Sequence, residues 1–563
     1  MKVIIVGGVA GGATAAARIR RLDEHAEITV FERSGYISYA NCGLPYYIGD
    51  VITDPEELTL QTPESFFKRF RINMKIHHEV ISIHLDRKTV SVKNLENGEI
   101  FEENYDKLIL SPGAKPTQPR LPGVGMDKLF TLRTVEDTFR IKEYINKNHP
   151  KSAVLAGGGF IGLELAENLR ELGMDVTIVQ RPKQLMNPFD PDMASMIHNE
   201  MRKHGIKLVL GYTVEGFKEK DNGVEVLLKD NPSLQADMVV LAIGVTPDTA
   251  LAKEAGLELG IKGSIVVNDR METSVPDIYA AGDAVQVKHY VTGDDALISL
   301  AGPANKQGRI IADNICGGDS HYLGSQGSSV IKVFDMTAAT TGINETNAKK
   351  SGLDVDTVIL SPMSHAGYYP GGKVMTMKVV FEKETYRLLG AQIIGYEGVD
   401  KRIDVLATAI HAGLKATQLK DLDLAYAPPY SSAKDPVNMA GFMIDNIAKG
   451  TLKQWHLEDM DKISKDKSVV LLDVRTVGEF NRGHMDGFRN IPVDELRERI
   501  NEIEKGKPVY LICQSGLRSY IASRILEGNG YETYNFSGGF RFYDTVVNDR
   551  ALIERAYACG MDY

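Results

Sequence analysis

The sequence predicts an α/β protein with two strand–helix–strand units, a mixed third region and a separate α/β segment toward its C-terminal end. Three observations support this prediction. Two apolar segments each lead into a glycine cluster and then an Ala- and Leu-rich stretch, at KVIIVGGVAGGATAAARIRRL and SAVLAGGGFIGLELAENLRELG. The composition changes near residue 450. Beyond that point, from Val469, new short apolar runs begin with VVLLDVR and PVYLIC, which is typical of an independent α/β domain.

Composition narrows the class of protein. The chain has 563 residues, of which 43% are hydrophobic and 25% charged, so it matches a globular protein of about three to five domains. Its net charge of -10 argues against a nucleic-acid partner. No apolar run approaches the roughly 18 to 20 residues that span a membrane. The four cysteines are too few and too scattered for a secreted disulfide framework, so we expect a cytoplasmic protein without a metal site.

The first strand–helix–strand unit begins near Val3 and ends at the strand EITVFER, which contains Glu32. Gly7 and Gly12 occupy two positions of the G-x-G-x-x-G pattern, and Val9 occupies the middle one. Glycines at these positions let the backbone approach a pyrophosphate, while the helix N-terminus faces its negative charge. A carboxylate at the end of the second strand can accept hydrogen bonds from ribose hydroxyls. The unit is therefore predicted to bind a dinucleotide.

The second unit begins near Ala153 and matches the glycine pattern fully. Its three glycines are Gly157, Gly159 and Gly162. At the end of its second strand stands Gln180, followed by Arg181, where an acidic residue would indicate NADH. Because an arginine can contact the 2′-phosphate of NADPH, the nucleotide preference stays open.

Cys42 lies in the segment SYANCGLPYYIGD, whose Gly, Pro and Asn residues favour a bend or a helix start. Backbone N–H groups there would favour a thiolate. No other cysteine precedes Cys316, so Cys42 has no neighbour with which to form an internal disulfide. Its oxidised form must be a mixed disulfide with a small thiol, a sulfenate or a persulfide.

The segments GGVAGG, SYANCGLPYY, SPGAKP, GGGFIGLE and YAAGDA, in this order, resemble the flavin-dependent pyridine nucleotide-disulfide oxidoreductases. Within them the chain is similar to the coenzyme A (CoA) disulfide reductases, including rhodanese-fused persulfide or polysulfide reductases. The resemblance implies two Rossmann-like domains, an α+β dimerisation domain and an α/β rhodanese domain. The implied division is an FAD-binding domain at 1–112 and 245–322, an NAD(P)-binding domain at 113–244, a dimerisation domain at 323–445, a linker at 446–460 and a rhodanese domain at 461–563.

The same resemblance implies that FAD binds the first unit and Asp283, and that NAD(P)H binds the second unit. The cofactor-binding residues that it implies are Gly7, Ala10, Gly12, Glu32, Arg33, Gly113, Asp283, Gly157, Gly159, Gly162, Glu164 and Gln180.

CoA is the small thiol that the resemblance implies for Cys42. The residues that match its contact positions are Thr14, Arg18, Arg21, Ser38, Asn41, Arg71, Asn305, Lys306, Arg309 and Lys434. The planar guanidinium fork of arginine suits a phosphate. The alternative for Arg18, Arg20 and Arg21 is a solvated helix face without a ligand.

The segments SHAGYYPGGK and AYAPPYSSAKDPVNMAG resemble the family's dimerisation domain, which implies a homodimer. In that family two tyrosines of this domain enter the partner's active site, and Tyr368 and Tyr426 match them. Their hydroxyls could donate to a departing thiolate or hydrosulfide, and packing in a core is the alternative role.

The segment DVRTVGEFNRGHMDGFRNIP, followed by CQSGLRS, resembles a single-domain rhodanese. The resemblance implies a persulfide on Cys513, a loop closed by Arg518, and organising roles for Asp473, Arg475 and His484. A cysteine at the end of a strand, before a short loop and a helix, places backbone N–H groups around its sulfur.

Together these features predict an FAD-dependent NAD(P)H oxidoreductase that reduces CoA persulfide or polysulfide through a Cys42–CoA mixed disulfide, with sulfane sulfur supplied by the rhodanese domain. The alternatives are a CoA disulfide reductase, an NADH oxidase or peroxidase, and a sulfur carrier or sensor with little turnover. Ala10 disfavours the peroxidase, because those enzymes have an acid–base histidine in this loop. Cys316 and Cys559 belong to no motif and are expected to be structural or incidental.

Overall fold

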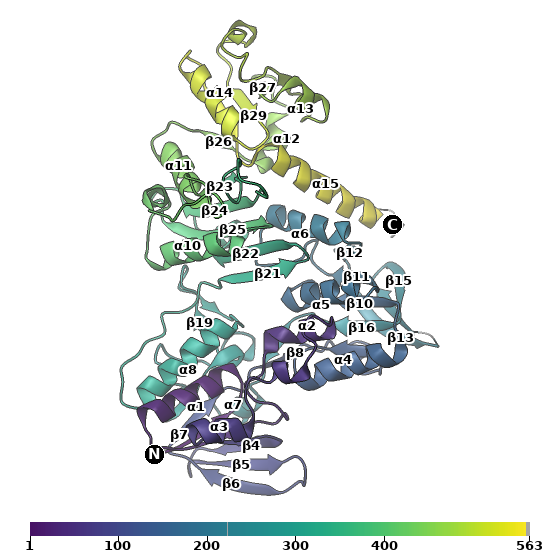
Figure 1. Cartoon of the computed structure of the whole chain (residues 1–563), viewed down its shortest axis with the longest axis vertical. Helices are drawn as coiled ribbons and strands as arrows, with labels where there is room; N and C mark the ends of the chain where they lie inside the picture. Colours follow the sequence, from purple (N-terminus) through teal and green to yellow (C-terminus); the bar gives the residue numbers. More distant parts are fainter. Residues whose placement is uncertain (222, 559–563) are drawn as a thin grey trace. The chain divides into compact units, whose positions relative to one another are not determined.

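The computed structural model describes residues 1–221 and 223–558, and Figure 1 shows its ribbon. These residues form two compact units. The first contains Met1–Pro182 and Ile206–Gly327, and the second contains Lys183–Gly205 and the chain from Ser328 onward. Within the described ranges, no helix is long and apolar enough to cross a membrane.

The first sheet of the first unit contains the N-terminal strand. Its order is β18-β7-β1-β2-β3, and all its pairings are parallel. Its strands are β18 (Ile278–Ala280), β7 (Lys107–Leu110), β1 (Lys2–Val6), β2 (Glu27–Phe31) and β3 (Asn73–Lys75). Parallel strands buried on both faces are near-continuous apolar runs, as KVIIV is here.

Around this sheet lie α1 (Ala10–Leu22), η1 (Asn41–Gly43), α2 (Leu44–Ile48), α3 (Pro63–Phe70), α7 (Ala250–Glu254), η4 (Gly282–Ala284) and α8 (Ala301–Ile315). An antiparallel sheet of β4 (His78–His84), β5 (Thr89–Asn94) and β6 (Ile100–Asn104) completes the region.

Helices α1 and α8 pack side by side, as Figure 1 shows. Small residues make this approach possible. A Cβ atom on Gly308 of α8 would stand 2.4 Å from the carbonyl oxygen of Gly11 in α1. The Ala- and Gly-rich stretch after β1 is therefore required by helix packing as well as by the glycine loop.

The second sheet of the first unit has the order β12-β11-β10-β16-β9, again with parallel pairings. Its strands are β12 (Lys207–Leu210), β11 (Asp175–Gln180), β10 (Ser152–Ala156), β16 (Met238–Leu241) and β9 (Leu129–Thr131). The accompanying elements are α4 (Val135–Asn148), α5 (Phe160–Glu171) and the antiparallel strands β13 (Val214–Lys220), β14 (Gly223–Leu228) and β15 (Asn231–Ala236).

The larger sheet of the second unit is antiparallel, with the order β21-β22-β25-β24-β23. Its strands are β21 (Ser329–Val333), β22 (Met336–Gly342), β25 (Leu388–Gly395), β24 (Thr376–Glu382) and β23 (Val355–Leu360). The helices of this region are α6 (Pro191–Lys203), α9 (Glu345–Lys350), α10 (Val399–His411) and α11 (Pro436–Ala448). Helix α6 belongs to this unit, although our division assigned it to the NAD(P)-binding domain.

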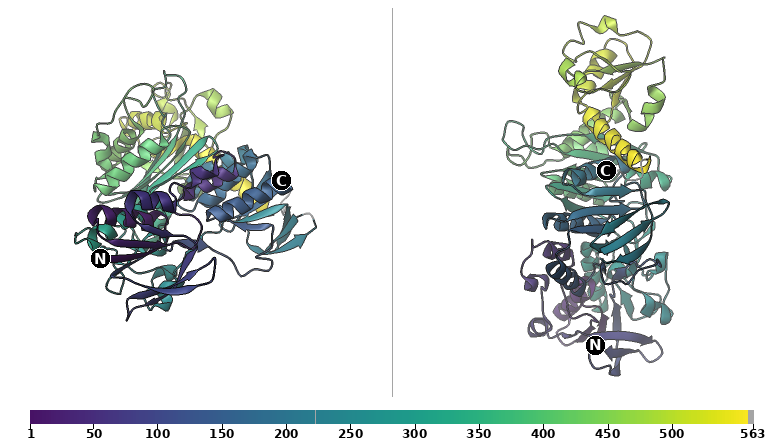
Figure 2. Two further views of the ribbon diagram at one scale, coloured as in Figure 1. Left: turned by 60° about the horizontal axis from the view of Figure 1, so that its bottom comes forward. Right: turned by 90° about the vertical axis from the view of Figure 1, so that its right-hand side faces the viewer.

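The small C-terminal sheet is parallel and has the order β26-β30-β29-β27-β28. Its strands are β26 (Gln454–Trp455), β30 (Thr533–Phe536), β29 (Val509–Ile512), β27 (Val470–Asp473) and β28 (Arg489–Asn490). It is accompanied by α12 (Met460–Ile463), α13 (Val477–Asn481), α14 (Leu517–Glu527) and α15 (Gly539–Ala558), the last extending toward α6 in Figures 1 and 2.

The segment 446–460, predicted as a linker, is largely structured. It contains the end of α11 and strand β26, which pairs with β30. Trp455 of β26 is 2% exposed and donates a hydrogen bond to the carbonyl of Leu511. Trp455 was not predicted as a core residue, because its neighbours in the sequence are polar. The predicted fold class is confirmed, with two Rossmann-like sheets, an antiparallel sheet with helices and a C-terminal α/β domain.

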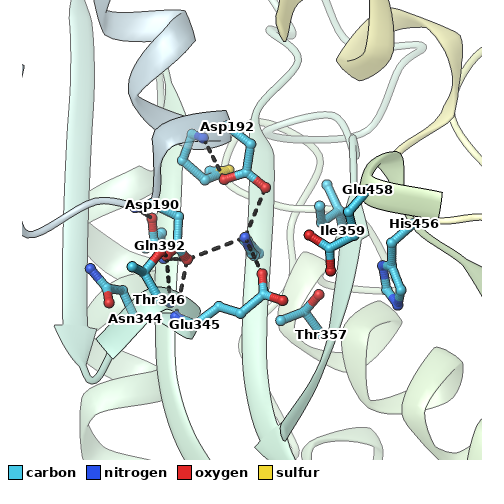
Figure 3. A network of polar contacts seen from close by, with 12 residues as sticks. Asp190, Asp192, Asn344, Glu345, Thr346, Thr357, Ile359, Gln392, His456 and Glu458 are labelled. Carbon is cyan, nitrogen blue, oxygen red and sulfur yellow. Dashed lines mark hydrogen bonds and ion pairs between the residues drawn. The ribbon is translucent and has the colours of Figure 1, made fainter. Parts of the chain in front are cut away.

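A buried ion cluster fixes α6 and α9 on the antiparallel sheet. Lys378 of β24 is 1% exposed, and its Nζ lies 2.8 Å from Asp192, 3.2 Å from Asp190 and 2.7 Å from Glu345. Figure 3 shows the three carboxylates converging. Burial alone would lower the pKa of Lys378, but the carboxylates raise it above the usual lysine value. The cluster therefore holds a charged lysine inside the unit.

Candidate active sites

The first glycine loop is shaped by close backbone contacts. Gly7 has φ 97°, and a Cβ atom there would stand 2.1 Å from the carbonyl oxygen of Ser111. A Cβ atom on Gly12 would stand 1.9 Å from the carbonyl oxygen of Gly7. Glycine is required at both positions, because any side chain would push β1, β7 and α1 apart. Ala10 is the first residue of α1.

Glu32 at the end of β2 holds this loop in place. Its carboxylate accepts hydrogen bonds from the backbone N–H of Gly8 at 2.8 Å and of Ser34 at 2.9 Å. Burial raises the pKa of Glu32, although these two N–H groups act in the opposite direction. Next to it, Arg33 forms an ion pair with Asp248 at 2.8 Å.

A cavity of about 910 Å³ opens beside this loop. Its lining includes Gly7, Glu32, Arg33, Gly113 and Arg133. Gly113 has φ 71°, a backbone conformation that favours glycine. A cavity of this volume, lined by a glycine loop, a buried carboxylate and arginines, fits a dinucleotide such as FAD.

Asp283 lies on η4 and pairs with Arg133, whose Nη2 is 2.7 Å from its carboxylate. The two residues are far apart in sequence, and the sequence analysis missed Arg133. Its position in TLRTVED, just before a capped helix, is no signal of a cofactor site by itself. Arg133 connects the expected FAD residue Asp283 to the wall of the cavity.

The second glycine loop repeats this design with a neutral residue. Gln180 at the end of β11 accepts a hydrogen bond from the N–H of Gly158 at 3.1 Å. Cβ atoms on Gly157 and Gly162 would stand 2.2 Å from backbone oxygens, whereas one on Gly159 would meet nothing within 4 Å. The open space at Gly159 is where a nucleotide can approach the backbone.

Cys42 lies on η1 and is exposed. Partial burial raises the pKa of its thiol, and the carboxylate of Glu164 raises it further. This differs from our expectation that local N–H groups favour a thiolate, because burial and the negative charge of Glu164 both disfavour a second negative charge on the sulfur. Glu164, on α5, itself has a pKa raised to about 7 by burial and by the charge of Glu167.

The residues expected to contact CoA gather mainly on α1 and α8. Thr14 donates to the side-chain oxygen of Asn305 at 2.6 Å, and Arg18 pairs with Asp313 at 2.8 Å. Arg309 approaches the same aspartate at 4.0 Å. Arg21 and Lys306 are exposed. The structure thus places six of the predicted residues, from two distant segments, on the packed pair of helices α1 and α8.

The alternative of a wholly solvated helix face is wrong for Arg20. Its side chain is 7% exposed and donates to the carbonyls of Phe70, Asp23, Glu24, Ala26 and Arg71. It is a structural residue of the first unit. Periodicity could not separate it from its neighbours, because its carbonyl partners include residues about 50 positions away.

The remaining predicted CoA residues are more scattered. Ser38 precedes Cys42 and has φ 44°, and Asn41 begins η1. Arg71 caps α3 with φ 51°, and its guanidinium lies over the ring of Phe67. Lys434 is an exposed residue of the second unit.

Tyr368 and Tyr426 form a pair in the second unit. Their hydroxyl oxygens are 2.7 Å apart, and the rings are 76% and 45% exposed. The hydrogen bond raises the pKa of Tyr426. Exposure excludes the core-packing role within one chain, and leaves both hydroxyls accessible to another molecule.

Cys513 follows the C-terminal end of β29, and the short loop 514–516 separates it from α14. It is 1% exposed, and its Sγ accepts hydrogen bonds from the N–H of Gly516 at 3.1 Å and the hydroxyl of Ser519 at 3.2 Å. Gly516 has φ 98°, which turns its N–H back toward the sulfur. Such donors stabilise negative charge on a thiolate or persulfide.

Arg475 lies close to this loop. It is buried, donates hydrogen bonds to the carboxylate of Asp473 at 2.7 and 2.9 Å, and its guanidinium lies 3.8 Å from the centre of the Phe540 ring. His484 is exposed, and its Nδ1 donates a hydrogen bond to the carbonyl oxygen of Phe480 at 3.1 Å.

Arg518 makes two hydrogen bonds of 2.7 Å to Glu479, which the sequence analysis missed. These bonds lower the pKa of Glu479 to about 2. The available signal was Thr476-x-x-Glu479, a capping box that starts α13.

The other two cysteines are Cys316 and Cys559. Cys316 ends α8 and is partly buried, and burial raises its pKa. Cys559 lies outside the described residues.

Comparison with known proteins matches this geometry. Residues 1–308 match the pyridine nucleotide-disulphide oxidoreductase family, 328–436 its dimerisation domain and 456–544 the rhodanese-like domain. The coenzyme A disulfide reductase of Staphylococcus aureus (strain JH9) is 39% identical over 443 residues, covering 78% of this chain and 99% of that protein.

Two solved structures extend the similarity to the rhodanese domain. Reduced Bacillus anthracis CoADR-RHD is 48% identical with a TM-score of 0.95, covering 98% of each chain. The NAD-dependent persulfide reductase from A. fulgidus is 39% identical with a TM-score of 0.90, covering 96% of this chain and 100% of that one. The resemblance seen in the sequence is confirmed: the chain is an oxidoreductase that belongs to the pyridine nucleotide-disulphide oxidoreductase family and contains a rhodanese-like domain.

Proposed function

We propose that the protein reduces the persulfide of CoA, or a polysulfide, with NAD(P)H through a mixed disulfide between Cys42 and CoA. The observation that supports this most is that Cys42 is exposed next to Asn41, a residue of the cavity lining, while the buried Cys513 receives hydrogen bonds suited to holding sulfur. The CoA disulfide reductase and persulfide reductase relatives agree with it.

Cys42 acts as the nucleophile. Its thiolate attacks the CoA-bound sulfur of CoA–S–SH, so that Cys42–S–S–CoA forms and hydrosulfide leaves with the electron pair of the broken S–S bond. When bound, FAD would take two electrons from NAD(P)H and pass them to this disulfide, which is thereby reduced to the two thiols. Glu164, with its pKa of about 7, can hold a proton beside Cys42 at neutral pH.

The geometry of the two glycine loops supports the proposed cofactor-binding residues. We assign the cavity beside Gly7, Glu32, Arg33, Gly113 and Asp283 to FAD, and the loop of Gly157, Gly159, Gly162 and Gln180 to NAD(P)H. The domain division predicted from the sequence is kept, with β26 moved into the rhodanese domain and α6 described with the dimerisation domain.

A homodimer completes the site in this proposal. The match to the dimerisation domain supports it, and Tyr368 and Tyr426 would reach the partner's Cys42 as proton donors to the leaving thiolate or hydrosulfide. Thr14, Arg18, Asn305 and Arg309 would hold the CoA phosphates and adenosine. Arg21, Ser38, Asn41, Arg71, Lys306 and Lys434 are the further CoA residues proposed.

The rhodanese domain supplies sulfane sulfur. Cys513 would hold it as a persulfide and pass it to CoA. We propose a cytoplasmic location, where free thiols persist, since Cys42, Cys316 and Cys513 are all unpaired with one another.

The experiment that tests the proposal is anaerobic NAD(P)H oxidation with CoA persulfide, with sulfide measured in parallel. One sulfide per NAD(P)H is expected. The water-forming NADH oxidase from Lactobacillus brevis is 31% identical with a TM-score of 0.77, covering 80% of this chain and 99% of that one, so oxygen consumption is the second assay. Turnover with oxygen but not with CoA persulfide would favour an oxidase instead.

A further inference from the structure

The positive charge of Arg518 is neutralised by an ion pair with Glu479. Both of its terminal nitrogens donate to Glu479 at 2.7 Å, in a parallel two-point contact. Thr476 donates to the same carboxylate through its hydroxyl at 2.9 Å and through its N–H at 3.0 Å. Glu479 is thus held rigidly at the start of α13, and it holds the guanidinium that closes the Cys513 loop.

The second cation of the loop is also neutralised. Arg475 donates two hydrogen bonds to one carboxylate oxygen of Asp473 and one to the other. Its remaining donors go to the carbonyl of Gly483 at 2.7 Å and to Gln514 at 3.4 Å. Its other contact is the face of Phe540, so this guanidinium adds no free positive charge.

The charges of Arg518 and Glu479 cancel, as do those of Arg475 and Asp473, so a Cys513 thiolate adds one negative charge to this group of side chains. The stabilising groups around its sulfur are neutral dipoles, the N–H of Gly516 and the hydroxyl of Ser519. A doubly charged donor such as thiosulfate would be repelled by the negative charge of this thiolate, and the burial of Cys513 strengthens that Coulomb interaction relative to water. A donor with one charge or none is repelled much less.

We infer that Cys513 takes its sulfur from the persulfide of a thiol in preference to thiosulfate, and that Glu479 is the positioning residue that sets this preference by pairing with Arg518. The inference rests on the proposed sulfurtransferase role. In the favoured step the Cys513 thiolate attacks the outer sulfur of R–S–SH, giving Cys513–S–SH, and RS⁻ leaves with the electron pair. With thiosulfate the leaving group would be sulfite, a dianion formed in the same negative loop.

The test compares two donors on the full-length chain with Cys42→Ser, so that only sulfur loading is followed. The donors are thiosulfate and the persulfide of mercaptoethanol, and mass spectrometry of the Cys513 peptide gives each rate. Glu479→Gln frees the charge of Arg518, so the rate ratio of thiosulfate to persulfide should rise roughly tenfold. The matched control is Glu502→Gln, which also breaks a two-point pair, with Arg499, and should leave the ratio unchanged.

Ionic strength gives a second readout that needs no change at Glu479. Salt screens repulsion, so thiosulfate loading should become several-fold faster between about 0.05 and 0.5 M salt, while persulfide loading changes less. An unchanged ratio in Glu479→Gln, or thiosulfate loading that slows with salt, would overturn the inference alone. Loading by neither donor would overturn the proposed sulfurtransferase role together with it.

Discussion

The chain contains two cysteine sites that are built in opposite ways. Cys42 lies on a short turn and is exposed. Partial desolvation of its thiol and the charge of Glu164 raise its pKa. Cys513 is 1% exposed and receives hydrogen bonds from Gly516 and Ser519. Among the described residues, no hydrogen bond to the sulfur of Cys42 is found, so the first site suits a sulfur that is exchanged with an external thiol. The second suits a sulfur that is held and passed on.

The largest expected effect separates these roles. Cys42→Ser should abolish NAD(P)H-driven sulfide release from CoA persulfide, by at least about 10³-fold, because no other described cysteine lies beside the dinucleotide cavity. Cys513→Ser should retain that activity when CoA persulfide is supplied directly. Sulfide release that survives in Cys42→Ser would remove the distinction between the two sites.

The Cys513 site depends on the buried pair of Asp473 and Arg475, with side-chain exposures of 0% and 2%. Asp473→Asn leaves a buried guanidinium without its carboxylate, so the rhodanese domain should lose about 3–5 kcal/mol of unfolding free energy. Denaturant unfolding followed by Trp455 fluorescence measures this, since Trp455 is the chain's single tryptophan and packs in that domain. The exposed pair of Arg499 and Glu502 is the control, and Glu502→Gln should cost less than about 1 kcal/mol.

The tyrosine pair is expected to act at Cys42 and not at Cys513. The double substitution Tyr368→Phe and Tyr426→Phe should lower kcat for persulfide reduction about 10²-fold, because both candidate proton donors are lost. Sulfur loading of Cys513 should stay the same. Equal losses in both assays would indicate a general defect in folding.

The smallest expected effect is a pH shift at Cys42. Its raised pKa means that alkylation by iodoacetamide should reach its midpoint above the ordinary cysteine value of about 8.5. Glu164→Gln removes a carboxylate that disfavours the thiolate, so the midpoint should move to lower pH by up to about one unit. Peptide mapping distinguishes Cys42 from Cys513. A midpoint that moves upward would contradict the electrostatic role of Glu164.

Much of the fold could be predicted because its signals are local. Gly7, Gly12, Gly157 and Gly162 stand where any Cβ atom would collide with backbone, so the sequence pattern and the geometry agree. The strand β26 could not be found, since two residues in a polar segment form no periodic pattern.

The sites were predicted less completely because their partners come from distant segments. Arg133 meets Asp283 across 150 positions, and Arg518 meets Glu479 across 39. The hydrophobic periodicity of a sequence contains no information about such long-range pairs. The raised pKa of Cys42 was missed for the same reason, because it depends on burial by the folded chain and on the charge of Glu164 in a distant helix.

The central claim is that Cys42 forms a mixed disulfide with CoA. The most direct measurement is the intact mass of the purified, oxidised full-length chain beside that of Cys42→Ser, before and after reduction. We expect an adduct with the mass of CoA on the unchanged chain, absent from Cys42→Ser and released as CoA by reductant. An adduct of glutathione on Cys42, or no thiol adduct at all, would contradict the account.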